Sequence, residues 1–297
     1  GIWCDWEAQG TRLSQNLLHD NQRPPFASVL KGGMMSQDIF VEVGHGPTLI
    51  DNNIMLSDAS LRFATEGVAL VHNLICGALT CVGGGTGPRY TPYHMPHRTE
   101  VMGFMTILHG DDRFYNNIFV QKWPSDDIIT MHDSDDGFDT ENRAAGTWMF
   151  DEYPTYDEWI SQFDFSKPAD MAKLYGAHEG KLPVWIEGNA YLGGAKPSKK
   201  DVNALISAVA REDVRVELVQ KEDGYYLDTN VYELIEGFKN RMIDSDVLGK
   251  AFEPEERFEN PDGTAIRFDS DYFGTHRGVD VIPGPFADAK ESVKKLY

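Results

Sequence analysis

The 297-residue sequence predicts an all-β protein in two parts: a partial parallel β-helix over residues 1–195 and an antiparallel β-sandwich module over residues 196–297. The first part is indicated by short strand-like runs that recur with an Asn at a turn. The second is indicated by alternating runs joined by tight turns. A hydrophobic content of 41% is enough for a packed core.

The repeat rests on four segments in which an Asn precedes a pair of apolar residues, at Asn16, Asn53, Asn73 and Asn117. The intervals are 37, 20 and 44 residues, and we interpret the last as two turns of 22. The first is interpreted as one turn of roughly 23 residues plus about fourteen extra ones. Such a period is typical of stacked β-helix coils. The recurrent Asn also predicts a ladder of side-chain amides along the stack.

Alternation along each run predicts which side chains face the core. Those expected to point inward are Ile2, Cys4, Trp6, Ile39, Val41, Val43, Leu61 and Phe63. The opposite, exposed face then carries Trp3 and Asp5 from the first run, Phe40 and Glu42 from the second, and Arg62 from the third. Unpaired carboxylates are costly inside a β-helix, so the outward placement of the two acids is also the favourable one.

Asp5 and Glu42 occupy equivalent positions of two repeats, because each lies eleven residues before the Asn of its repeat. Equivalent positions on neighbouring coils are about 4.8 Å apart. Retaining glycosidases hold their two carboxyl groups about 5–5.5 Å apart. The spacing therefore indicates a retaining glycosidase, with Trp3 and Phe40 as an aromatic wall for a sugar. The alternative is a pair of solvated surface acids, although stacked like charges are destabilising.

The remaining segments follow in order. Residues 23–37 contain Pro-Pro and Gly-Gly, which predicts a surface loop inserted between the two carboxylates. Residues 92–98 predict a rigid loop rich in hydrogen-bonding side chains, either ligand-facing or structural. Residues 155–163 predict a short helix, and residues 185–191 resemble one last coil.

The pattern changes after about residue 195. Runs at 214–219 and 225–231 flank a tight turn at 222–224, which predicts a β-hairpin. Runs at 256–258 and 264–268 predict a second hairpin around Asn-Pro-Asp-Gly. Two hairpins with alternating patterns favour a β-sandwich module.

Composition excludes several function classes. The net charge is −20, of which −17 falls after residue 122, so nucleic acids and anionic membranes are poor partners. The sequence contains no run of 18 apolar residues, so it predicts no membrane-spanning helix. The three Cys lack the spacing of metal ligands, so we expect free buried thiols and no metal site. Free thiols favour a reducing compartment such as the cytoplasm. The chain opens on a strand-like run without Met, and we expect it to be the back part of a longer protein, so the absence of a leader is uninformative.

Several motifs resemble glycoside hydrolase family 120. They are Ile-Trp-Cys-Asp-Trp at residues 2–6, Phe-Val-Glu-Val-Gly-His at 40–45, Tyr-Thr-Pro-Tyr-His-Met-Pro-His at 90–97 and Asp-Tyr-Phe-Gly at 271–274. The resemblance spans nearly the whole chain. It implies a right-handed parallel β-helix with a β-sandwich, and retaining β-xylosidase activity that releases xylose from β-1,4-xylo-oligosaccharides. It also implies that Asp5 is the nucleophile and Glu42 the acid/base.

Beyond the two carboxylates, the residues expected to contact the sugar are Trp3, Trp6, Phe40, His45, Arg62, Tyr93 and His94. Arg62 either binds substrate or faces away. The expected partner is a xylo-oligosaccharide, no cofactor is expected, and a homo-oligomer stays open. Three alternatives remain: another β-glycosidase or an arabinosidase, a non-catalytic β-helix fragment that binds glycans, and a pectate-lyase-like enzyme. The pectate-lyase-like enzyme is disfavoured because such lyases need a calcium-binding cluster of acidic residues.

Overall fold

The computed structural model of the chain is mostly β, with few and short helices. It describes residues 1–21, 37–83, 90–123, 129–131, 140–164, 166–167, 181–288 and 290–297. The loop predicted at 23–37 lies outside the described residues, apart from residue 37.

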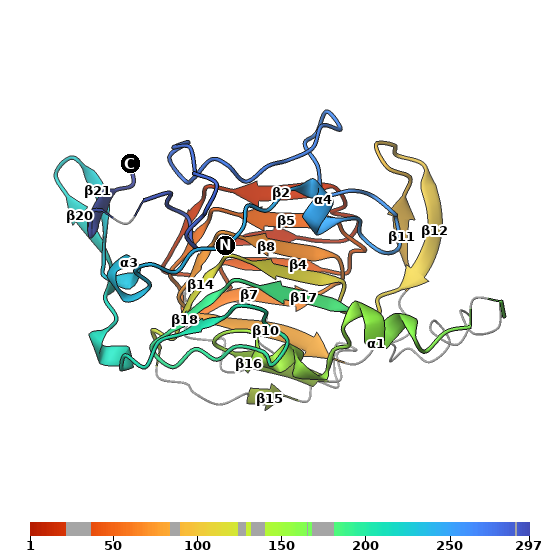
Figure 1. Cartoon of the computed structure of the whole chain (residues 1–297). Helices are drawn as coiled ribbons and strands as arrows, with labels where there is room; N and C mark the ends of the chain where they lie inside the picture. The colour runs from red at the N-terminus through yellow and green to blue at the C-terminus, as the bar shows by residue number, and fades with distance from the viewer. Residues whose placement is uncertain are drawn as a thin grey trace, which may run out of the picture.

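Three sheets form the body of the molecule, and in each of the first four layers the chain contributes one strand to each sheet (Figure 1). The first sheet holds, in spatial order, β1 (Ile2–Cys4), β4 (Ile39–Glu42), β7 (Ala59–Ala64), β10 (Ala78–Gly83), β16 (Thr140–Ala144) and β15 (Ile129–Met131). The second holds β17 (Val184–Glu187), β13 (Asp112–Tyr115), β8 (Val68–Val71), β5 (Thr48–Asp51) and β2 (Thr11–Ser14). The third holds β19 (Leu205–Ile206), β18 (Ala190–Leu192), β14 (Ile118–Val120), β9 (Leu74–Ile75), β6 (Ile54–Met55) and β3 (Leu17–Leu18).

Pairing within these sheets is parallel, except where β16 pairs antiparallel with β10 and β15. Parallel neighbours need a crossover connection, which here is the remainder of each circuit through the other two sheets. The predicted mostly parallel β architecture is therefore observed.

A ladder of Asn side chains joins the layers, as predicted. The Nδ2 of Asn16 donates to Oδ1 of Asn53 at 2.9 Å, and Asn53 donates to Asn73 at 3.1 Å. Asn73 donates to Asn117 at 2.9 Å, and Asn117 to Asn189 at 3.1 Å. Asn189, from the segment that resembled one last coil, is thus the fifth rung.

One interval in the repeat was interpreted wrongly. Asn73 bonds Asn117 directly, so these 44 residues form one circuit and not two turns of 22. The excess length includes an antiparallel hairpin, β11 (Tyr90–His94) with β12 (Val101–Thr106), which extends from one side of the stack (Figure 1). A hairpin outside the ladder leaves the register of the layers unchanged.

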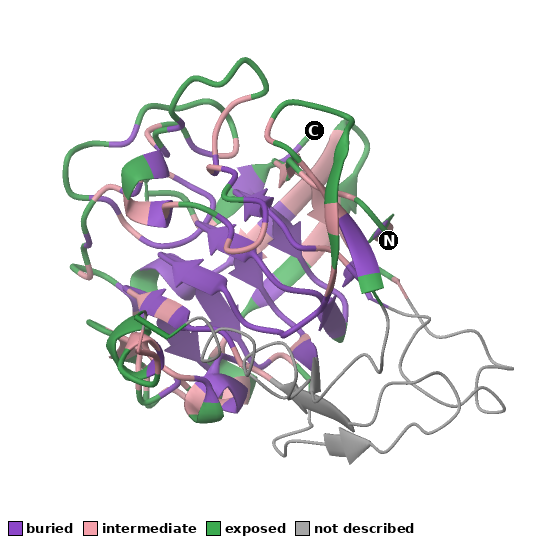
Figure 2. Cartoon of the chain, turned by 90° about the vertical axis from the view of Figure 1, so that its right-hand side faces the viewer, coloured by how far each residue is buried: buried purple, intermediate pink, exposed green. Residues whose placement is uncertain are grey.

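The interior between the sheets is apolar, and the strands of the stack are largely buried (Figure 2). Ile39, Val41, Leu61 and Phe63 pack there with at most 1% exposure, as alternation predicted. Trp6 is an exception at 47% exposure, because β1 ends at Cys4 and the chain turns before it reaches Trp6. The inward placement expected of Trp6 is therefore wrong.

The C-terminal region begins with elements that continue the stack, since β19 pairs with β18 up to Ile206. The first predicted hairpin is confirmed by β20 (Val216–Lys221) and β21 (Gly224–Thr229), to which β22 (Val293–Lys295) adds a third strand. The second is reduced to a single antiparallel bridge between Glu259 and Ala265. Among the described residues after 206, these three strands form the one sheet, so the sandwich module and the boundary at residue 195 stay predictions.

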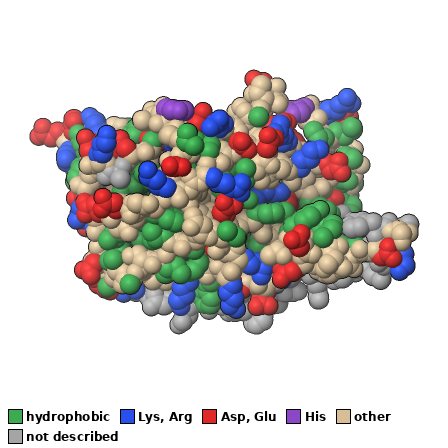
Figure 3. Space-filling model, in the orientation of Figure 1, with side chains coloured by type: hydrophobic (Ala, Val, Ile, Leu, Met, Phe, Trp, Pro, Cys, Tyr) green, Lys and Arg blue, Asp and Glu red, His purple; other side chains and the backbone are tan. Residues whose placement is uncertain are grey.

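The helices are short. Those in the described residues are η2 (Trp148–Glu152), α1 (Tyr156–Ile160), η3 (Arg211–Asp213), α3 (Val231–Leu234) and α4 (Ser245–Leu248). The predicted helix at 155–163 is confirmed by α1, whose first turn is closed by a reciprocal capping box between Thr155 and Glu158. Within the described part of the chain, none of the helices has the length and hydropathy needed to cross a membrane. The three Cys are free and buried, as predicted, and acidic and basic side chains are interspersed on the face shown in Figure 3.

Candidate active site

Strand pairing brings the two predicted catalytic carboxylates to neighbouring positions. β1 and β4 pair in parallel, with Trp3 opposite Phe40 and Cys4 opposite Val41. Asp5 is the residue after Cys4, and Glu42 is the residue after Val41 and the last of β4, so the same register sets the two acids opposite each other. Neighbouring strands lie about 4.8 Å apart, which sets the separation of the two backbones.

The environments of the two acids differ. Asp5 is exposed, and its Oδ1 accepts the backbone N–H of Trp6 at 2.8 Å. Glu42 is only 7% exposed, and its Oε2 accepts the indole N–H of Trp3 at 3.1 Å. Asp5 is therefore open to an incoming ligand, whereas Glu42 is screened from water and held by Trp3.

We expected the outer face of this sheet to be exposed, but Phe40 and Arg62 on this face are buried. Phe40 is 5% exposed and Arg62 is 0% exposed. Trp3 stacks on Phe40 with ring centroids 5.5 Å apart, and the Arg62 guanidinium lies 5.2 Å from the centre of the Phe40 ring. Trp3 remains 57% exposed, so of these three side chains it alone offers substantial surface to a ligand. The direct sugar contacts predicted for Phe40 and Arg62 do not fit this burial.

His45 is occupied by two buried contacts. Its Nδ1 lies 2.7 Å from Oε1 of Glu66, and its Nε2 lies 3.1 Å from the backbone oxygen of Thr91. A carboxylate and a carbonyl both accept, so an imidazolium, in which both ring nitrogens donate, satisfies both contacts. Burial by itself lowers the pKa of His45, but the hydrogen bond and charge of Glu66 outweigh it, and the pKa is raised. At 2% exposure His45 anchors β11 to the stack, and the predicted sugar contact does not fit.

The β11–β12 hairpin is joined to the loop that follows Asp5. The Tyr93 ring packs edge-on against the His45 ring at 5.5 Å. Gln9 bonds both backbone groups of His94, donating to its oxygen at 3.1 Å and accepting its N–H at 2.8 Å. His94 also lies 3.4 Å from a carboxylate oxygen of Glu7. Tyr93 and His94 are half-buried, and their contact with a sugar stays a prediction.

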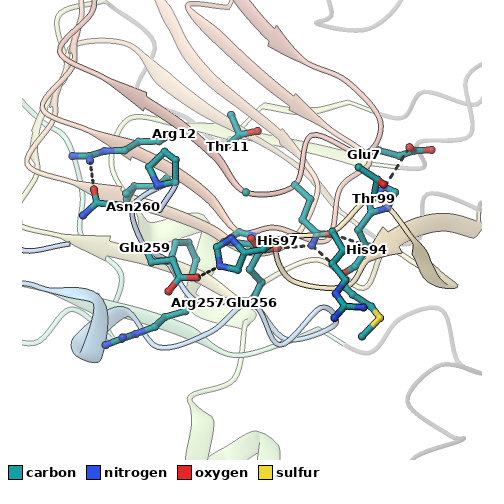
Figure 4. Close-up of a pocket in the computed structure, with 18 residues that line it drawn as sticks. Glu7, Thr11, Arg12, His94, His97, Thr99, Glu256, Arg257, Glu259 and Asn260 are labelled. Carbon is teal, nitrogen blue, oxygen red and sulfur yellow. Dashed lines mark hydrogen bonds and ion pairs between the residues drawn. The ribbon is translucent and has the colours of Figure 1, made fainter. Parts of the chain in front are cut away.

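A pocket of about 830 Å³ opens beyond this loop (Figure 4). Its walls come from residues 7–12, the turn at 94–99 and residues 256–261, together with Pro47 and Leu49. Neither Asp5 nor Glu42 lines it. The sequence identified the Asn-Pro-Asp-Gly segment at 260–263 as a turn and as a motif of the family resemblance, but did not predict that Asn260 and Pro261 line this pocket.

Comparison with known proteins gives one informative likeness. No family model matches this sequence, and no curated protein matches it. A solved structure described as "The complex structure of XylC with xylose" matches with a TM-score of 0.79 and 30% identity over 100% of this chain. This chain spans 41% of the length of that one.

Proposed function

We propose that this chain carries the catalytic carboxylates of a retaining glycoside hydrolase that releases xylose from β-1,4-xylo-oligosaccharides. The observation that carries the proposal is the parallel pairing of β1 with β4, whose register, continued by one residue, sets Asp5 opposite Glu42 on the neighbouring strand. A strand spacing of about 4.8 Å matches the separation of about 5–5.5 Å that a retaining mechanism needs. The likeness to XylC, whose structure was solved with xylose, supports a carbohydrate-active protein and a xylose-type sugar.

The same proposal extends to the fold and the family. The three sheets of mostly parallel strands, joined by the Asn ladder, support a right-handed parallel β-helix. Membership of glycoside hydrolase family 120 is proposed from the motifs at residues 2–6, 40–45, 90–97 and 271–274. The C-terminal sandwich belongs to this proposal as well, with the hairpin of β20 and β21 as its support.

The mechanism uses the different environments of the two acids. Asp5 attacks the anomeric carbon while Glu42 gives its proton to the departing oxygen, which forms a xylosyl ester on Asp5 and frees the shortened oligosaccharide. Glu42 then takes a proton from water, the water oxygen attacks the anomeric carbon, and β-xylose leaves with the carboxylate of Asp5 restored. The indole N–H of Trp3 donates to Oε2 of Glu42 and orients this carboxyl group.

The other predicted residues divide into two groups. The side chains proposed to touch the sugar are Trp3, Trp6, Tyr93 and His94. Those proposed to support them from behind are Phe40, His45 and Arg62. The division follows exposure, since Trp3 and Trp6 are 57% and 47% exposed while the supporting group is buried.

Substitution of the two acids tests the proposal. Asp5→Ala should lower kcat on nitrophenyl β-xyloside by about 1,000-fold or more, because the covalent intermediate cannot form. Glu42→Ala should retain turnover of dinitrophenyl xyloside, and added azide should yield β-xylosyl azide. Glu217→Ala, which alters an exposed acid of β20, is the control and should keep full activity. Release of α-xylose as the first product, followed by proton NMR, would contradict the retaining mechanism.

Assays of the same protein distinguish the proposed function from two alternatives. A panel of aryl glucosides, arabinosides and xylosides distinguishes another β-glycosidase or an arabinosidase from a xylosidase. Saturable binding of xylo-oligosaccharides without turnover would identify a glycan-binding protein.

A further inference from the structure

We infer that the pocket between the β11–β12 turn and residues 256–261 binds the leaving-group sugars of a xylo-oligosaccharide substrate. This rests on the proposed function, because an enzyme that releases one terminal xylose places every further sugar on the leaving-group side. The pocket volume of about 830 Å³ lies in the usual range for small-molecule sites, about 300–1,000 Å³.

The position of the pocket follows from the two catalytic strands. Glu7 lines it two residues after Asp5, and Pro47 lines it five residues after Glu42. Both strands therefore run from their carboxylates toward the same pocket. His94, 3.4 Å from Glu7, lies with it at one end of the pocket (Figure 4). A sugar chain that extends from the acids past Glu7 enters this space.

The lining suits an uncharged polyhydroxylated ligand. Its formally charged members are Glu7, Glu256, Glu259, Arg12, Arg98 and Arg257. Three carboxylates balance three guanidiniums, and Arg12 is already paired with Asp51 at 2.8 Å. His97 lies 2.6 Å from Glu259. Balanced donors and acceptors match hydroxyl groups, which both donate and accept, whereas a phosphate or carboxylate ligand would meet no net positive charge.

The walls are held in place before any ligand arrives. The Gln9 amide donates to Oε2 of Glu256 at 2.5 Å and to the backbone oxygen of His94 at 3.1 Å. This one side chain thus connects the loop after Asp5, the hairpin and the C-terminal wall. A preformed site loses little conformational entropy on binding, which favours an oligosaccharide that has many flexible groups of its own.

The test compares substrates that differ in the leaving group. Thr99→Trp puts a large ring into the pocket, and Glu100→Trp, at the next residue and outside the lining, is the matched control. The substrates are xylotriose and β-xylosyl fluoride, whose fluoride leaving group is too small to occupy the pocket. Thr99→Trp should lower the ratio of kcat/KM for xylotriose to that for the fluoride by about 10-fold or more, and Glu100→Trp should keep it within about twofold. His97→Ala, which trims an exposed side chain, should lower the ratio by about 3-fold.

The outcomes separate this inference from the proposed function. Equal losses on both substrates, or an unchanged ratio in both pocket variants, would overturn the pocket assignment while Asp5→Ala still tests catalysis. If the unaltered chain turns over neither substrate, calorimetric titration with xylotriose decides on the pocket alone. Saturable binding that Thr99→Trp abolishes and Glu100→Trp retains supports the assignment, and binding that ignores Thr99→Trp, or no binding, overturns it.

Discussion

Replacement of Asn73 by Ala removes the middle rung of the ladder. Asn73 is fully buried; its Oδ1 accepts the backbone N–H and the Nδ2 of Asn53 at 2.9 and 3.1 Å. Its Nδ2 donates to Asn117 at 2.9 Å and to the backbone oxygen of Ile50 at 2.8 Å. Four bonds at roughly 1 kcal/mol each are lost, and the stranded N–H of Asn53 adds about 1–2 kcal/mol, so the free energy of unfolding should fall by about 5 kcal/mol.

Asn16 is the matched control at the edge of the ladder. Among the described residues, its Nδ2 donates to Asn53 and to the backbone oxygen of Ser14. Asn16 is half-buried, so water can replace the hydrogen bonds that Asn16→Ala removes. That variant should lose about 1–2 kcal/mol. Urea unfolding followed by circular dichroism measures both values. A loss in Asn73→Ala no larger than that in Asn16→Ala would refute the idea that the ladder holds the layers in register.

Two further predictions concern buried titratable groups. Asp201 accepts hydrogen bonds from Asn189 and Tyr191, and burial raises its pKa from 3.8 to about 6. The free energy of unfolding should therefore fall as pH rises from about 4 to about 6, and Asp201→Asn should flatten that part of the melting-temperature profile. An equal slope in the variant would contradict this role of Asp201. The pKa of His45 is raised above 6.5, so its pair with Glu66 stabilises fully below that pH and less as pH rises through the raised pKa. His45→Gln should then lower the melting temperature more at pH 6 than at about pH 9, and equal losses would contradict the imidazolium assignment.

The stack and the pairing of the two catalytic strands could be predicted because they depend on local regularities. An Asn recurs at the turn, and the offset from Asp5 to Asn16 equals that from Glu42 to Asn53. That equality alone specifies the register that β1 and β4 adopt. Burial of alternate residues follows from the same period of two.

The remainder depends on residues far apart in the sequence, which leave no periodic signal. His45 follows Glu42 closely and resembled a sugar ligand, but Glu66 and Thr91 occupy both of its nitrogens. The pocket wall joins Gln9 to Glu256 across 247 positions. The 44-residue interval was misread because its length fits two turns as well as it fits one circuit with a hairpin. The hydrogen bonds between rungs and the direct pairing of β13 with β8 distinguish these two cases.

The ladder also bears on how such a chain can change during evolution. Successive rungs are separated by 37, 20, 44 and 72 residues, yet each makes the same amide contact with the next. The alignment of neighbouring layers through the ladder therefore uses one Asn side chain per layer and does not depend on the length of the chain between two rungs. Insertions and deletions can accumulate in the connections, including the β11–β12 hairpin, without displacing Asp5 relative to Glu42. Laboratory libraries that seek new sugar preferences should accordingly diversify these connections and leave the five Asn positions unaltered.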